Sequence, residues 1–428
     1  METHGKAMIE KVMEVNMKGL SSLTRLLCVG AAAGGLAVGL GLERLHAHEE
    51  PDAGSEAHYR LFIGDHADGV VRAVEVEDGS SAGTFRIDQS PALTPSLSGR
   101  TVFAVQGDAG KVAVIGTGIS LEDHGDHSDL KVEAARLLPT VISGAKPAHV
   151  VEDSGTIAVF DDGTGDLALF PEKQLLEGGF EPRLMKPGAA HHGLAAPMGS
   201  HVVVSVPHAD PQEPRVGLKV IDKDGNQVGE VANCPGVHGQ AQSARTFAFG
   251  CRDGIVIATP GRGSEPPVLE HVSTSGLGEG YVSTLKGGTA MQFFLGNYGP
   301  NAVVIIEPGA GESFRKIDLP TRRVDFALDP AKARNAYILT EDGRMHLLDI
   351  LSGRIEKSVR ITEPYSMDGH WRDPRPRLAV AGGHVAVTDP LKGLVRLVST
   401  ETLEEERTIP VEGKPYTIVA VGGSGAVH

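Results

Sequence analysis

Length, composition and charge narrow the class of protein before any motif is considered. The chain has 428 residues with 55 glycines, 26 prolines and only 4% aromatic residues, a composition typical of many short strands joined by turns. Its formal net charge of -15 argues against a nucleic-acid partner, because phosphate binding requires clustered lysine and arginine. The 18 histidines are an excess that a fold alone does not explain.

The N-terminal region, residues 1–47, predicts an upstream extension followed by a signal peptide. Lys18 and Arg25 precede an apolar run over 26–42, and a polar segment follows it. A membrane anchor is the alternative, but a run of about 17 residues rich in Gly and Ala is short for a stable span. We therefore expect export to the periplasm, cleavage of the signal and no stable membrane insertion.

The segment HAHEE (46–50) places two histidines at the start of the expected mature chain. His46 and His48 are retained if cleavage occurs near 39–41, and residues 48–57 then form a flexible His-rich and acidic segment. Short His-rich tracts bind metals weakly. We interpret both histidines as lower-ranked metal ligands.

Residues 58–428 predict a single all-β domain, a β-propeller. The chain repeats units of about 35 to 45 residues, each with short apolar runs separated by Gly, Asp or Pro turns. Two such units cover 148–188 and 191–233. The count favours about eight four-stranded blades, with seven as the alternative because 363–376 resembles an insertion.

The two ends of this domain are predicted to close the ring. Residues 60–87 supply three strands of a blade that lacks its innermost strand. The segment KPYTIVAVGG (414–423) has the pattern of an inner strand and can pair with them. Closure of this kind removes the open edges of a sheet.

Two of the three cysteines remain after signal cleavage, because Cys28 lies in the apolar run. Cys234 and Cys251 are separated by two predicted strands and a turn, and an oxidising compartment allows them to pair. A thiolate metal site is the weaker alternative, since neither cysteine belongs to a CxxC spacing. We predict a disulfide.

Three consecutive repeat units begin with a histidine, at His149, His192 and His238. The start of an inner strand faces the centre of a propeller, so these imidazoles are expected to converge. Zn²⁺ suits tetrahedral sites with nitrogen ligands. We therefore predict a zinc site there, with His191 as a lower-ranked or supporting residue. The ordinary alternative for each position is a hydrogen bond to a turn.

Two further histidine positions are candidates. The segment LEDHGDHSDL (121–130) places His124 and His127 among four carboxylates in a loop of the second unit, where they could bind Zn²⁺ or form a solvated acidic turn. His370 precedes an inner strand beside the only Trp and is a lower-ranked ligand at the mouth of the channel.

Five spaced motifs resemble the AztD-type periplasmic zinc metallochaperones. They are DHGDH (123–127), KPAHVV (146–151), HHGLA (191–195), CPGVHG (234–239) and FGCRDG (249–254). The resemblance implies a propeller that binds Zn²⁺ and transfers it to the solute-binding protein of a zinc ABC transporter. It also implies that an N-terminal His segment assists, although HAHEE is a short one.

The working hypothesis is a monomeric, non-enzymatic zinc carrier. A lactonase-like propeller hydrolase is one alternative, although such enzymes more often surround a Ca²⁺-type centre with Asp, Glu and Asn. A metal-independent interaction scaffold is another, since the fold does not exclude it. No convincing nucleophile elbow, phosphate loop or dinucleotide motif favours catalysis.

Overall fold

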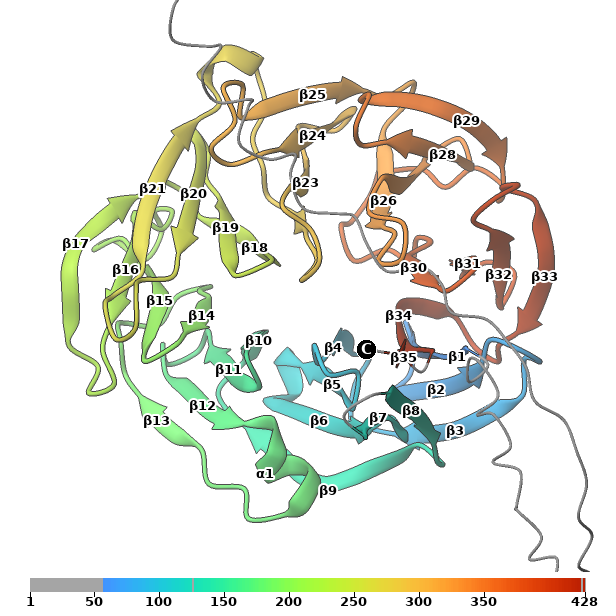
Figure 1. The fold of residues 1–428 in the computed structure, drawn as a ribbon, viewed down its shortest axis with the longest axis horizontal. Helices are drawn as coiled ribbons and strands as arrows, with labels where there is room; N and C mark the ends of the chain where they lie inside the picture. Colours follow the sequence, from blue (N-terminus) through green and yellow to red (C-terminus); the bar gives the residue numbers. More distant parts are fainter. Residues whose placement is uncertain (1–56, 125–126, 425, 428) are drawn as a thin grey trace, which may run out of the picture. The chain divides into compact units, whose positions relative to one another are not determined.

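The computed structural model describes residues 57–124, 127–424 and 426–427. Eight four-stranded antiparallel sheets are arranged as the blades of a propeller, with their innermost strands around a common axis (Figure 1). This arrangement confirms the prediction of eight blades and excludes seven. The expected signal peptide, His46 and His48 lie outside the described residues.

Blade one joins the two ends of the domain. From the innermost strand outward it contains β34 (Pro415–Gly423), β1 (His58–Asp65), β2 (Val70–Glu75) and β3 (Ser81–Arg86). The antiparallel pairing of β1 with β34 runs from His58 opposite Gly423 to Asp65 opposite Pro415. The ring is therefore closed by the C-terminal strand, as the sequence predicts.

Blade two carries an insertion between its third and fourth strands. The blade contains β4 (Ala92–Pro95), β5 (Thr101–Gln106), β6 (Lys111–Gly116) and β9 (Arg136–Ser143). Between β6 and β9, a hairpin of β7 (Ile119–Asp123) and β8 (His127–Val132) forms a separate three-stranded sheet with β35 (Ala426–Val427). The DHGDH motif, expected in a loop, thus lies at the tip of a hairpin that pairs with the C-terminal residues.

Each of the other blades is built from four consecutive strands. Blades three to five contain β10 (Pro147–Asp153), β11 (Thr156–Asp161), β12 (Leu167–Pro171), β13 (Arg183–Met185), β14 (Ala195–Met198), β15 (His201–Val206), β16 (Gly217–Ile221), β17 (Gln227–Asn233), β18 (His238–Ser243), β19 (Thr246–Gly250), β20 (Gly254–Thr259) and β21 (Val268–Ser273). Blades six to eight contain β22 (Leu285–Lys286), β23 (Phe294–Asn297), β24 (Ala302–Ile306), β25 (Phe314–Asp318), β26 (Arg323–Leu328), β27 (Asn335–Thr340), β28 (Arg344–Asp349), β29 (Arg354–Arg360), β30 (Leu378–Ala381), β31 (His384–Asp389), β32 (Leu394–Ser399) and β33 (Glu405–Pro410).

Helical structure is confined to short connections within the described ranges. They are α1 (Glu172–Glu177) and the 3-10 turns η1 (Gly107–Ala109) and η2 (Ser275–Leu277). None of the helices in these ranges combines the length and the apolar character that a membrane crossing requires.

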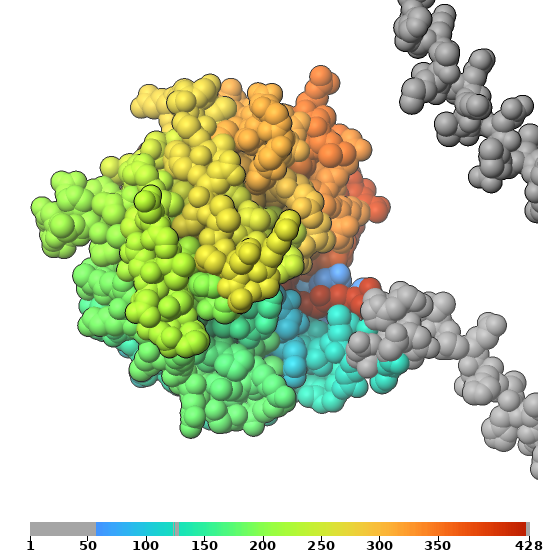
Figure 2. All heavy atoms as spheres, turned by 60° about the vertical axis from the view of Figure 1, so that its left-hand side comes forward, coloured from blue at the N-terminus to red at the C-terminus, as the bar shows by residue number. Residues whose placement is uncertain are grey.

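The core lies between neighbouring blades, which explains the strand patterns. Middle strands such as β24 are buried along their whole length, because each of their faces packs against another blade. Outer strands such as β21 contain only half-buried and exposed residues. Phe247 and Phe249 of β19 pack with Val203 and Leu218 of the preceding blade. Figure 2 shows the green, yellow and orange blades packed side against side.

The propeller has two faces that the strand direction distinguishes. Inner strands begin on one, which we call the entry face, at residues such as Pro147, His238 and Pro415. They end on the opposite one, the exit face, at residues such as Asp153 and Gly423. The β7–β8 hairpin follows β6, which ends on the exit face.

A disulfide joins Cys234 to Cys251, with their Cα atoms 4.9 Å apart. Cys234 lies between β17 and β18, and Cys251 directly follows β19. The predicted pairing is confirmed.

Candidate metal site

The structure brings His149, His192 and His238 together on the entry face. His149 lies in β10, His192 precedes β14 and His238 begins β18, so three consecutive blades contribute one imidazole each. The ring centroid of His192 lies 5.2 Å from that of His149 and 5.3 Å from that of His238. The centroids of His149 and His238 are 6.4 Å apart.

Hydrogen bonds fix the orientation and the tautomer of two of these rings. Nδ1 of His238 donates to the carbonyl oxygen of Ser283 at 2.9 Å, and Nδ1 of His192 donates to the carboxylate of Asp162 at 2.6 Å. Each neutral ring therefore keeps its lone pair on Nε2. The two Nε2 atoms lie 3.4 Å apart.

That separation is suited to a shared metal ion. Two nitrogens bound about 2.05 Å from a tetrahedral zinc ion lie about 3.3 Å from each other. Two lone pairs that face each other at this distance make no hydrogen bond, whereas a cation between them interacts favourably with both. The arrangement can hold a divalent cation with nitrogen ligands.

Asp162 supports this arrangement. It follows β11 directly, and its second carboxylate oxygen accepts a hydrogen bond from the backbone N–H of Gly193 at 3.2 Å. The carboxylate thus holds both the ring of His192 and the chain that follows it. A carboxylate on the far nitrogen of a histidine is a common feature of zinc sites. Sequence reasoning missed Asp162, although it stands in the turn of the unit that contains His149.

Arg215 links the loops that carry His192 and His238. Its Nη1 donates to the carbonyl oxygen of His192 at 2.8 Å, and its Nε donates to that of Val237 at 2.6 Å. Burial lowers the pKa of Arg215 from its ordinary value. The sequence contains no motif that would have singled out this residue.

Burial also favours the neutral form of His149 and of His238. Burial, the largest cause, and the neighbouring His192 and His238 together lower the pKa of His149 to about 4. The pKa of His238 is lowered mainly by burial as well. Neutral imidazole is the form that binds metals, so His149 is ready to bind at neutral pH.

His191 lies beside this group but points elsewhere. Its Nδ1 donates to the carbonyl oxygen of Ala189 at 2.7 Å, and its Nε2 accepts from the hydroxyl of Ser205 at 2.8 Å. The ring also contacts Phe160, with centroids 5.1 Å apart. Both nitrogens are thus engaged in hydrogen bonds, and a supporting role for His191 stays a prediction.

The other candidate histidines lie in different places. Nε2 of His124 lies 3.4 Å from a carboxylate oxygen of Asp129, in the β7–β8 hairpin beyond the exit face. His127 begins β8, but its side chain is outside what the structure describes. Nδ1 of His370 accepts a hydrogen bond from the backbone N–H of Arg372 at 3.1 Å, within its own loop. The structure does not bring these histidines into the group of three.

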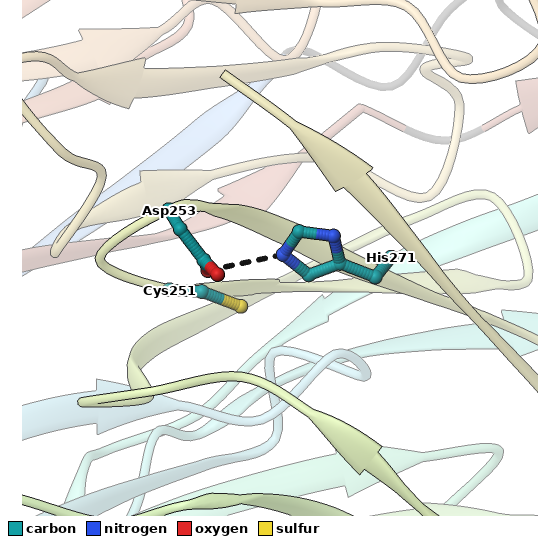
Figure 3. A group of neighbouring side chains, drawn as sticks. All are labelled: Cys251, Asp253 and His271. Atoms are coloured by element: carbon teal, nitrogen blue, oxygen red, sulfur yellow. Dashed lines mark hydrogen bonds and ion pairs between the residues drawn. The ribbon is translucent and has the colours of Figure 1, made fainter. Parts of the chain in front are cut away.

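Two groups of three residues have ligand atoms that all lie within 4.8 Å of one another among the described residues, and the three histidines are not one of them. One combines His58, Glu75 and Glu77, where Glu75 already pairs with the buried Arg60. The second combines Cys251, Asp253 and His271 (Figure 3).

Comparison with known proteins places the chain in a family. It is 44% identical over 391 residues, 91% of this chain and 92% of the other, to a Citrobacter koseri protein named zinc chaperone AztD. The chain belongs to the AztD family. The crystal structure of Citrobacter koseri AztD matches with a TM-score of 0.84 at 45% identity, covering 87% of this chain and all of that one.

The AztD fold also resembles that of more distant propellers. The dihydro-heme d1 dehydrogenase NirN matches this AztD-family chain with a TM-score of 0.55 at 15% identity, covering 84% of this chain and 74% of the other. At this sequence identity, the structural similarity shows a shared fold and nothing about function. No family model matches the chain.

Proposed function

We propose that this protein is a periplasmic zinc metallochaperone that binds Zn²⁺ through His149, His192 and His238 and has no enzymatic role. The separation of 3.4 Å between Nε2 of His192 and Nε2 of His238 carries this proposal. Membership of a family with a named zinc chaperone supports zinc as the cargo.

The exposure of the group supports transfer rather than storage. The side chain of His192 is 46% exposed, whereas His149 lies deeper between the blades. A partner that docks on the entry face can therefore reach the ion from the side of His192 and replace one ligand at a time. Three protein ligands leave the fourth tetrahedral position for water or for a ligand of the partner.

The partner we propose is the solute-binding protein of a zinc ABC transporter. The acidic surface, with a net charge of -15, favours the capture of cations before transfer. His124, His127, His46 and His48 are proposed as weaker positions that acquire or pass on the ion, and the carrier is proposed to act as a monomer.

The test compares residues 49–428 of the wild type with His149→Ala, His192→Ala and His238→Ala. Zinc affinity is measured by competition with a chromophoric chelator at neutral pH, and folding by circular dichroism. His384→Ala serves as the control, because His384 is a half-buried histidine paired with Glu406 in blade eight. Each of the three variants should remain folded and lose tight zinc, while the control retains it.

Transfer is measured separately, by mixing the zinc-loaded protein with the apo solute-binding protein and separating the two. Zinc should move faster than it dissociates into a chelator alone. If the three variants bind zinc as the wild type does, the proposed site is wrong. If binding is lost in them but the wild type does not transfer, the carrier role is wrong.

A further inference from the structure

A second group of ligand atoms lies in blade five, around the disulfide. Cys251 follows β19, Asp253 stands in the turn before β20 and His271 lies in β21 (Figure 3). Nε2 of His271 is 3.0 Å from a carboxylate oxygen of Asp253. One ligand atom from each of the three residues lies within 4.8 Å of the other two.

The disulfide prevents this group from acting as a metal site. Zinc binds the thiolate form of cysteine, and the sulfur of Cys251 is covalently bonded to that of Cys234. In the oxidised protein only a carboxylate and one imidazole remain. A sulfur, a nitrogen and an oxygen ligand together form a donor set that zinc accepts.

We propose that reduction of the Cys234–Cys251 disulfide creates a second zinc site formed by Cys251, Asp253 and His271. A dithiol reductant supplies the two electrons: the protein disulfide breaks into two thiols, and the reductant becomes a disulfide. Zinc then bonds to the sulfur of Cys251, and the thiol proton leaves to solvent. Water completes the tetrahedron.

The exposure of His271 and Asp253 gives an ion access to this group. Cys251 is 1% exposed, whereas the side chains of His271 and Asp253 are 28% and 47% exposed. The ion can therefore enter from the side of the imidazole and the carboxylate. These two ligands are already separated by a distance that suits one zinc ion, so the thiolate is the component that reduction adds.

The same disulfide also holds the loop that leads to His238. The backbone N–H of Val237 donates to the carbonyl oxygen of Cys234 at 3.1 Å, and that of Arg252 donates to Pro235 at 2.8 Å. Reduction frees the sulfur of Cys234 at the start of this loop. Reduction would thus create the second site and loosen the loop that carries His238. This coupling rests on the proposed function, whereas the second site does not.

The experiment uses Co²⁺ as a probe, since thiolate ligands give it an intense charge-transfer band that nitrogen and oxygen ligands do not. Cys234→Ser leaves Cys251 as a free thiol without any reductant. This variant of residues 49–428 should bind about one more equivalent of metal than the oxidised wild type and show the thiolate band. The wild type should gain both after treatment with a dithiol.

Matched variants identify the ligands. In the Cys234→Ser background, Cys251→Ser should abolish the band, and His271→Ala should weaken metal binding at this site at least tenfold. His384→Ala, which changes a similarly exposed histidine paired with Glu406, should leave the band unchanged. Circular dichroism verifies that each variant is folded.

A variant that lacks the three histidines of the first site distinguishes a failure of this proposal from a failure of the proposed function. When His149, His192 and His238 are all replaced by Ala, the thiolate band of Cys234→Ser should persist. If neither folded Cys234→Ser nor the reduced wild type shows the band, the second site does not form. If the band survives His271→Ala unweakened, the proposed ligand set is wrong.

Discussion

Nε2 of His192 and Nε2 of His238 lie 3.4 Å apart although the two residues belong to different blades. Neither ring is free to rotate, because Asp162 holds the first and the carbonyl oxygen of Ser283 holds the second. The proposed zinc site is thus arranged in the metal-free protein. Preorganisation of this kind raises affinity, since little conformational entropy is lost on binding.

Asp162→Asn should lower zinc affinity by about 10- to 100-fold, the usual cost of losing a carboxylate behind a histidine ligand. An amide lacks the charge that stabilises the metal-bound imidazole of His192. Chelator competition measures the change. Asp224→Asn alters an exposed carboxylate paired with Lys223 and should bind zinc as the wild type does. Equal affinities in the two variants would contradict the role of Asp162.

Arg215→Ala should lower zinc affinity on the order of tenfold while the protein stays folded. The substitution removes the guanidinium that joins the carbonyl oxygens of His192 and Val237, so the two histidine-bearing loops can separate. Arg183→Ala is the control, because Arg183 also donates to a backbone carbonyl but lies at the outer edge of blade three. Unchanged affinity in Arg215→Ala would show that the loops hold their position without it.

The metal-free protein should lose stability as the pH falls from about 6.5 to 4. The pKa of His149 is about 4 when folded, against an ordinary value of 6.5, so the unfolded chain binds more protons in this window. The stabilising contribution is complete above pH 6.5 and is lost as the pH falls through the folded pKa. Its full size corresponds to about 3 kcal/mol.

Urea unfolding at pH 7 and at pH 4.5 measures this effect. His149→Ala should lose less free energy of unfolding than the wild type between the two pH values, because it lacks the group that titrates. Identical losses in the two proteins would show that other groups dominate the acid sensitivity.

Removal of the closing strand should prevent folding. A chain that ends at Glu412 lacks β34, which leaves the edge of β1 unpaired and exposes the apolar residues that β34 covers. A chain that ends at Gly423 keeps β34 and loses only residues 424–428, which include β35. Circular dichroism and size-exclusion chromatography should show the longer chain folded and the shorter one aggregated; a folded shorter chain would contradict the argument.

The repeat pattern of the sequence was sufficient to predict the blades, the closing strand and the disulfide. Each of these depends on local signals: apolar runs of strand length, turn residues between them, and two cysteines separated by two predicted strands. The positions of His149, His192 and His238 at the start of their units also predicted that they converge. Zinc binding at that point stays a prediction.

Only the tertiary structure decided which groups surround these histidines. Asp162 and Ser283 reach these histidines from other blades, and Arg215 joins the loop of His192 in blade four to that of His238 in blade five. Such contacts depend on the packing of neighbouring blades rather than on any local pattern. The place of the DHGDH motif on the exit face likewise follows from a hairpin that pairs with the C-terminal residues. Local sequence determines strands and turns, whereas the packing of whole blades determines which side chains meet across them.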